Sequence, residues 1–248
     1  MKIIPLSEGT FTVDQSKLFV PFKPNNDNLQ QRPSGSLLVE IQPFVVVTSK
    51  DILLIDTGLG FSNSDGTMQV HQNLIDNDIN PSDITKVLMS HLHKDHAGGV
   101  SIKDTILNQH FLSFPNATYY VQQPELNFAL QKGPPSYITD EIEILKNAGN
   151  VHFLEGNGTI DGYIRYEVTS AHSRWHQVFW IEENEDVVFF GGDDAPQLQQ
   201  MKSRFVAKYD YDGKKCMELR QQWWQQGQQE NWTFLFYHDV KNPVWKFK

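Results

Sequence analysis

One stretch of the chain, LMSHLHKDHAGG at residues 88–99, places three histidines and an aspartate within the six positions 91–96. The run before it, ITKVLMS, is apolar and predicts a buried strand that leads directly into the histidines. Side chains two apart on an extended backbone point to the same side, so His91 and His93 can face one point. Asp95 and His96 follow after a turn and can face a second point. The chain therefore has to fold so that a strand ends at this cluster, as strands of α/β sheets do.

The chemistry of these side chains indicates a metal site. Imidazole and carboxylate groups are ligands of Zn²⁺ and similar ions, and two such ions about 3.5–4 Å apart form a hydrolytic arrangement. Gly98 and Gly99 allow the backbone to pass close to such a site. A histidine-rich surface loop is the alternative, and it would explain a single HxH equally well. It does not explain HxHxDH placed directly after a buried strand, so we predict metal binding.

The remainder of the chain alternates strand-like and helix-like runs, which is typical of the α/β class. We interpret residues 36–58 as two strands around a turn at 49–51, and the β-rich region 151–192 as four short strands of a second sheet. Apolar residues at helical spacing predict helices over 68–79, 124–132, 140–148 and 212–230. We find no internal repeat and no linker. We expect a single domain over residues 1–248, with two αβ layers packed sheet to sheet.

Further ligands are expected at the ends of other predicted strands. His172 follows the run YIRYEV, Asp193 follows DVVFF, and His238 follows FLFY. These positions match that of the HxHxDH cluster, which also follows a strand. Three other histidines have no second ligand nearby in the sequence, and we expect ordinary structural roles for them: His71, His110 and His152.

Five ordered motifs together resemble those of the metallo-β-lactamase superfamily, and within it the lactonase-like hydrolases. They are LLIDTGLG, HxHxDH, AHSRWH, GGDD and YHD, and they extend from Asp56 to His238. The resemblance implies an α/β fold of the αββα sandwich type, in which two mixed β-sheets pack face to face and helices cover the outer faces.

The resemblance also implies a role for each matching residue. One ion would be held by His91, His93 and His172, and the other by Asp95, His96 and His238. Asp193 would bridge the two ions, with its neighbour Asp194 as the alternative, and Asp56 would orient a ligand from behind, as carboxylates near metal-bound imidazoles do. Asp95 or Asp193 would carry the proton to the leaving group. His176 is either a residue behind the ligands or a structural one.

A site of this kind serves hydrolysis. Two ions lower the pKa of a bridging water, so that hydroxide exists near neutral pH, and they polarise a carbonyl or phosphoryl oxygen. We predict a metal-dependent hydrolase that cleaves a lactone or an ester, or a phosphoester. The alternatives are a thioester hydrolase resembling glyoxalase II and a mononuclear iron dioxygenase acting on persulfides. We expect two divalent ions, with zinc first and Mn, Fe or Co as alternatives that tolerate the same ligands.

One departure concerns the substrate. Acyl-homoserine lactonases place a tyrosine shortly after the bridging aspartate, whereas this chain has Ala195, Pro196 and Gln197 there. Four aromatic residues are candidates for lining an apolar pocket: Phe19, Phe22, Tyr137 and Trp175.

Charge and composition argue against nucleic-acid and membrane partners, so we expect the binding partner to be a small-molecule substrate. The 21 Lys and Arg residues stand against 30 Asp and Glu, and a net charge of −9 would repel nucleic acid. No apolar run approaches the roughly 20 residues of a membrane span, and the first residues do not resemble an export signal. Since Cys216 is the sole cysteine, no internal disulfide can form. We expect a cytoplasmic protein without nucleic-acid or membrane partners, and exposed tryptophans at 223 and 224 would suit a homodimer contact.

Overall fold

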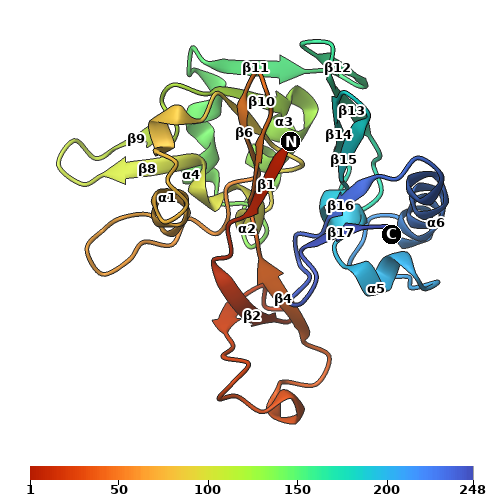
Figure 1. Cartoon of the computed structure of the whole chain (residues 1–248). Helices are drawn as coiled ribbons and strands as arrows, with labels where there is room; N and C mark the ends of the chain where they lie inside the picture. The colour runs from red at the N-terminus through yellow and green to blue at the C-terminus, as the bar shows by residue number, and fades with distance from the viewer. Residues whose placement is uncertain (248) are drawn as a thin grey trace.

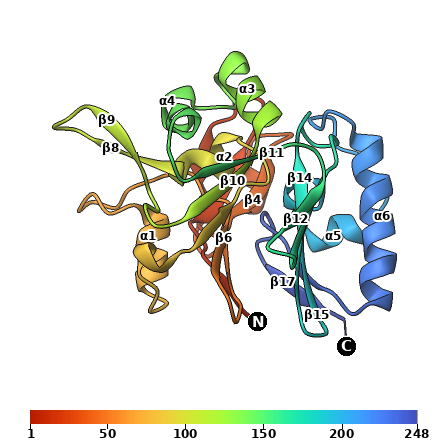
Figure 2. The same ribbon diagram turned by 90° about the horizontal axis from the view of Figure 1, so that it is seen from above.

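The computed structural model describes residues 1–247, and two six-stranded mixed sheets lie face to face at its centre. Figure 1 shows the sheets side by side, and Figure 2, seen from above, shows helices on both outer faces. The architecture is the αββα sandwich that the sequence predicted. The helices on the first sheet are α1 (Gln69–Ile75), α3 (Gln123–Lys132) and α4 (Thr139–Ile142), and those on the second are α5 (Leu198–Met201) and α6 (Gly213–Gln229).

The first sheet is antiparallel at one end and parallel at the other. Its order is β1 (Lys2–Pro5), β5 (Phe44–Val47), β6 (Ile52–Ile55), β7 (Lys86–Leu88), β10 (Thr118–Gln122) and β11 (Val151–Leu154). Strands β6, β7, β10 and β11 pair in parallel, so their carboxyl ends meet at one edge. Ligands placed after β6 and β7 are thereby brought together.

The second sheet is mostly antiparallel. Its order is β12 (Gly158–Ile160), β13 (Ile164–Val168), β14 (Gln177–Glu183), β15 (Asp186–Phe190), β16 (Thr233–Leu235) and β17 (Val244–Lys246). We assigned residues 151–156 to this sheet, and that prediction was wrong. The strand β11 pairs in parallel with β10 in the first sheet, because the helical segment between them carries the chain back to the same edge.

The predicted strand before the turn at 49–51 is in fact two strands that belong to different sheets. Pro43 has no N–H to donate to a ladder, and the extended run breaks at Gln42 and Pro43. The part before the break, β4 (Leu37–Ile41), pairs with β2 (Gly9–Val13), which also pairs with β3 (Phe19–Pro21). This three-stranded sheet projects below the sandwich in Figure 1.

The remaining elements are short. Strands β8 (Ser101–Asp104) and β9 (Gln109–Leu112) form a hairpin that the sequence analysis did not predict. The short helical turns are α2 (Lys94–Ala97), η1 (Leu29–Gln31), η2 (Pro81–Asp83), η3 (Gly98–Val100), η4 (Glu143–Lys146) and η5 (Gly192–Asp194).

Alternation along the strands builds the core. On β5, Phe44 faces the second sheet, where it packs edge-on against Phe190 with ring centroids 6.1 Å apart. Its neighbour Val45 points the other way, into the layer under the helices, together with Leu54 of β6. Because successive side chains point to opposite faces, a strand with apolar residues at every position serves both layers.

The helix α6 carries the two tryptophans that we considered for a homodimer contact. Trp223 is 4% exposed and packs on Phe189, with ring centroids 4.9 Å apart. Trp224 is half-buried and packs on Phe247. The expectation of an exposed pair was wrong for this reason, and the homodimer stays a prediction without that support. Within residues 1–247, none of the helices has the length and apolar character that crossing a membrane requires.

Candidate metal centre

All predicted site residues follow strand ends at one edge of the sandwich. Asp56 follows β6, the HxHxDH motif follows β7, and His172, Asp193 and His238 come after β13, β15 and β16. Between β7 and α2 the backbone is extended, which presents His91 and His93, and α2 then turns Asp95 and His96 toward a neighbouring point. The site therefore draws on both sheets.

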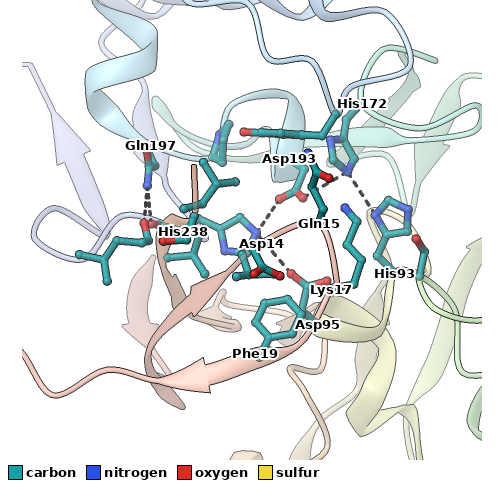
Figure 3. A pocket seen from close by; sticks show the side chains of 18 of the residues that line it. Asp14, Gln15, Lys17, Phe19, His93, Asp95, His172, Asp193, Gln197 and His238 are labelled. Carbon is teal, nitrogen blue, oxygen red and sulfur yellow. Dashed lines mark hydrogen bonds and ion pairs between the residues drawn. The ribbon is translucent and has the colours of Figure 1, made fainter. Parts of the chain in front are cut away.

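The seven side chains form two groups that meet at Asp193. Figure 3 labels the members that line the pocket: His93, Asp95, His172, Asp193 and His238. In the first group, His93 Nδ1 lies 2.9 Å from His91 Nε2 and 3.2 Å from His172 Nε2. Asp193 Oδ2 lies 3.3 Å from His172 Nε2. The second group consists of Asp95, His96 and His238.

In the second group, Asp95 Oδ2 lies 3.8 Å from His96 Nε2 and 3.5 Å from His238 Nε2. The other oxygen of Asp193, Oδ1, lies 3.2 Å from His96 Nε2 and 3.0 Å from His238 Nε2. The two oxygens of one carboxylate thus face two separate sets of ligand atoms.

Three of the imidazoles are held from behind by acceptors. His96 Nδ1 lies 2.8 Å from the Asp56 carboxylate, and His172 Nδ1 lies 2.8 Å from the Asp210 carboxylate. His238 Nδ1 lies 2.8 Å from the Glu40 carbonyl oxygen. Because these oxygens only accept, each Nδ1 carries the hydrogen. The Nε2 atoms keep their lone pairs, and these point at the centre.

This arrangement fits a pair of divalent cations. Three Nε2 atoms face the Asp193 carboxylate, which is repulsive unless a proton or a metal ion lies between them. Although burial acts against it, the Asp193 carboxylate raises the pKa of His96, His172 and His238, so the site attracts positive charge. Among the described residues, His96 Nε2 and Asp193 Oδ1 are buried atoms without a hydrogen bond. Burial and the neighbouring imidazoles hold the pKa of His91 and His93 well below the usual range, so both are neutral. Neutral imidazole is the form that binds a metal ion.

Asp56 links the ends of β6 and β7. Its side chain is fully buried, and its backbone has a φ of +54°, which is uncommon outside glycine. One carboxylate oxygen accepts from Ser90 N at 2.7 Å, and the other accepts from Ser90 Oγ at 2.7 Å and faces His96 Nδ1 at 2.8 Å. Asp56 therefore lies behind the His96 imidazole, and its role in orienting a metal ligand stays a prediction.

Glycines let the loop after β6 pack on the HxHxDH segment. A Cβ on Gly99 would lie 2.1 Å from the Thr57 carbonyl oxygen, and one on Gly60 would lie 2.2 Å from that of Gly98. Gly60 also has a φ of +72°. A side chain at either position would push the two loops apart.

The two aspartates after β15 have different surroundings. Asp193 lies between the two groups, whereas Asp194 accepts a hydrogen bond from His172 N at 2.7 Å and lies 3.0 Å from His176 Nδ1. Asp194 is thus placed behind the ligands. His176 accepts from Asp193 N at 3.1 Å through Nε2, so it supports the backbone that carries Asp193. Asp239 accepts hydrogen bonds from Leu198 N at 2.9 Å and from the backbone N–H groups of Lys241 and Asn242.

A pocket of about 730 Å³ opens over the two groups. Of the four aromatic residues proposed to line it, only Phe19 does so among the described residues. Phe22 is buried away from the pocket, and Trp175 lies on the surface. Tyr137 is buried beneath His93, with ring centroids 5.0 Å apart. The prediction was wrong for these three because aromatic character alone does not show which way a side chain points.

A family model for the metallo-beta-lactamase superfamily matches residues 41–205. The chain belongs to the metallo-β-lactamase superfamily. The match includes the HxHxDH motif, His172 and Asp193, and it ends before His238.

Several solved structures share the fold over nearly the whole chain. A probable metal-dependent hydrolase from Staphylococcus aureus has a TM-score of 0.79 and 21% identity, covering 100% of this chain and 92% of its own. The hydrolase AbOPH has a TM-score of 0.74 and 22% identity, covering 98% and 89%. The dizinc quorum-quenching lactonase AidC has a TM-score of 0.69 and 19% identity, covering 98% and 88%. At these identities the likeness shows the fold.

One curated relative is an atrochrysone carboxyl ACP thioesterase from Cryptosporiopsis sp. (strain 8999). It is 28% identical over 193 residues, which cover 73% of this chain and 51% of the relative. The chain therefore spans about half the length of this relative.

Sequence reasoning missed several residues around this metallo-β-lactamase site. Asp210, in the loop between α5 and α6, and the Glu40 carbonyl on β4 hold ligands from behind. Lys17 and Tyr209 line the pocket. None of them stands next to a motif, so no local signal marked them, although the doubled YDYD at 209–212 could have drawn attention to Asp210.

Proposed function

We propose that this chain is a hydrolase that uses two divalent metal ions, zinc in the first instance, to cleave a lactone or an ester, with phosphoesters as a further class. The observation that carries the proposal is the convergence of seven ligand-type side chains on two points that share Asp193. Membership of the superfamily supports the enzyme class, a metal-dependent hydrolase. Lactonase and hydrolase structures with the same fold support the substrate class.

Each residue has a role in this proposal. Two ions would supply polarisation of the substrate carbonyl or phosphoryl oxygen and a hydroxide nucleophile near neutral pH. One ion would be held by His91, His93 and His172, the other by Asp95, His96 and His238, and both by Asp193. Asp56, Asp210 and the Glu40 carbonyl hold the imidazoles in one tautomer and orientation.

Proton transfer falls to the carboxylates that reach the pocket. Asp95 and Asp193 both line it, and we assign to them the transfer of a proton to the leaving group. Tyr209 lines the same pocket beside His172, with ring centroids 6.2 Å apart. Its phenol is protonated at neutral pH and can donate a hydrogen bond to a substrate oxygen.

A thioester is the second candidate substrate. The observation in its favour is the curated relative, a thioesterase that matches 73% of this chain. The same attack on a carbonyl carbon would serve either an ester or a thioester, so the site chemistry is shared and the leaving group differs.

The test combines metal content with turnover. Metal per chain is measured on protein purified without chelator, and hydrolysis is followed for a panel of lactones, aryl esters, phosphotriesters and thioesters. We expect two ions per chain, hydrolysis in at least one class, and a loss of about a hundredfold or more in His93→Ala. His152→Ala is the matched control, because His152 is exposed on β11 outside the site.

Two outcomes would contradict the proposal. Full turnover in His93→Ala would show that the two groups do not form the reaction centre. A single iron per chain without hydrolysis of any panel member would favour the persulfide dioxygenase alternative.

A further inference from the structure

The pocket over the metal centre gathers positive charge in an acidic protein. The chain has a net charge of −9, yet four basic side chains from four separate segments line this one pocket: Lys17, Arg32, Lys94 and Lys208. They come from the turn after β2, the loop after η1, the first position of α2 and the loop before α6. The apolar lining of the pocket lies mainly along the Leu37–Val39 part of β4.

The four basic groups have no carboxylate partner. Across residues 1–247, none of them has an acidic oxygen within 4.0 Å, whereas other lysines of the chain, such as Lys86 and Lys246, form ion pairs. Arg32 donates only to the backbone carbonyls of Leu29 and Ser36, at 3.3 and 3.4 Å. A cation without a partner at a pocket wall is available to a ligand.

Asp14 is an acidic side chain of the pocket lining, and none of the four basic groups lies within 4.0 Å of its oxygens. Asp14 accepts from Ser16 N at 2.8 Å and from Ser16 Oγ at 2.6 Å, which closes the turn between β2 and β3. Asp95 and Asp193 are the other carboxylates of the pocket, and both belong to the proposed metal ligands. Outside the proposed metal ligands, the four cations therefore face a single carboxylate of the pocket lining, that of Asp14.

The same turn directs Lys17 at the site. Lys17 N donates to Asp14 O at 3.0 Å, and Lys17 has a φ of +60°, a left-handed conformation that a lysine rarely adopts. The side chain is half-buried, and Figure 3 shows it among His93, Asp95 and His172. Lys17 and His93 line the same pocket. Strain of this kind is usually kept at functional positions.

We propose that the substrate carries an anionic group, a carboxylate or a phosphate, beside the bond that is cleaved, and that Lys17 binds this group with help from Lys208. This inference rests on the proposed function, because it names the substrate class of the same pocket. Opposite charges attract at the wall of a partly buried pocket, and an analogue without the far anionic group would leave the lysines without a partner.

The test is a binding measurement that needs no turnover. Calorimetry on the metal-loaded protein compares valerate, glutarate and 4-phosphonobutyrate, which share one carboxylate for the metal centre and differ at the far end. We expect glutarate or 4-phosphonobutyrate to bind at least about tenfold more tightly than valerate. The preferred one of the two identifies the anion as carboxylate or phosphate.

Variants assign the preference to the lysines. Lys17→Met should reduce it several-fold, and Lys17→Met combined with Lys208→Met should abolish it. Lys23→Met is the matched control, because Lys23 is exposed on the same amino-terminal segment and does not line the pocket.

Equal affinity for all three acids, or a preference that persists in the double variant, would overturn the inference. The proposed function fails separately, through absence of hydrolysis in the substrate panel. A protein that hydrolyses neutral esters and shows no preference for anions would refute this inference alone.

Discussion

Asp210 is the residue whose change should separate metal affinity from folding. Its carboxylate holds His172 Nδ1 at 2.8 Å and comes from a loop that is distant in sequence from every motif. Replacing it with asparagine keeps the shape and removes the charge, so we expect metal affinity to fall about 10–100-fold. Competition with a chromophoric chelator measures this change. Asp212→Asn, two residues later, is the control and should leave affinity unchanged, since asparagine also caps α6.

Little change in the metal affinity of Asp210→Asn would mean that His172 is oriented by packing alone. A loss of the same size in Asp212→Asn would mean that the whole loop had shifted. The pair therefore distinguishes a positioning role from a structural one.

Glu8 should make stability depend on pH. Burial raises the pKa of Glu8 to about 8, although the hydrogen bond from Leu59 N at 2.7 Å acts against it. The unfolded chain releases this proton near the ordinary value of 4.5. Between these values the folded state binds more protons, so the free energy of unfolding falls as pH rises, by at most about 1.4 kcal/mol per pH unit.

Glu8→Gln, which resembles the protonated acid, should flatten this part of the pH profile. Chemical denaturation of both proteins at pH 5 and pH 8.5 provides the comparison. Parallel profiles for the two proteins would show that Glu8 is already ionised in the folded state at pH 5.

At the scale of the single residue, sequence reasoning found the groups with distinctive chemistry. His91, His93 and Asp193 could be predicted because imidazole and carboxylate groups that follow buried strands have few other uses. Apart from Asp56, the residues that hold the imidazoles from behind could not be predicted. Asp210 and the Glu40 carbonyl reach the site through contacts 38 and 198 positions apart in the chain, and such contacts exist only after folding.

Among the elements, the loop after β6 and the HxHxDH segment depend on each other. A Cβ on Gly99 would lie 2.1 Å from a backbone oxygen, which cannot move aside as a flexible side chain would. We expect Gly99→Ala to lower the free energy of unfolding by about 1–3 kcal/mol or more, and to weaken metal binding as well. Gly149→Ala is the control, because a Cβ there would meet nothing within 4 Å.

Denaturant unfolding of the two variants gives the answer. Gly149→Ala should change stability by less than about 1 kcal/mol. If Gly99→Ala were equally mild, the two loops would have to be able to separate without cost.

The elements themselves could be predicted to differing degrees. Helices with clear apolar spacing, such as α3 and α6, were found close to their observed bounds. The predicted helix over 68–79 ends early, at Ile75, because the chain turns there and η2 then starts at Pro81. Strand pairing was harder to predict, because an apolar run such as β11 could belong to either sheet. The helical connection before β11 determines which sheet it joins. The hairpin of β8 and β9 is half exposed and has no continuous apolar run to mark it.

For the molecule as a whole, the metal ions should join the two sheets. Four of the proposed ligands follow a strand of the first sheet, and three follow strands of the second. A ligand present at 100 times its dissociation constant stabilises the folded state by about 2.7 kcal/mol. For a chain of this size, removing it should lower the melting temperature by roughly 5–10 °C.

Scanning calorimetry before and after treatment with chelator tests this, and zinc added back should restore the melting temperature. In His238→Ala the shift should be smaller, because one group has lost a ligand. An unchanged melting temperature after verified metal removal would mean that the sheets hold together without the ions.

Because the proposed ligands are spread along the chain, the ribosome adds them at different times. The first and last of them, His91 and His238, are 147 positions apart (238 − 91). At about 5–20 residues per second, a ribosome needs roughly 7–30 s to pass from one to the other. During that interval His172 and Asp193 are made, and His238 is the last of the proposed ligands to be added. The set of Asp95, His96 and His238 therefore cannot be complete until the chain is released past His238, and the metal that the protein acquires depends on which ions are available when folding is completed.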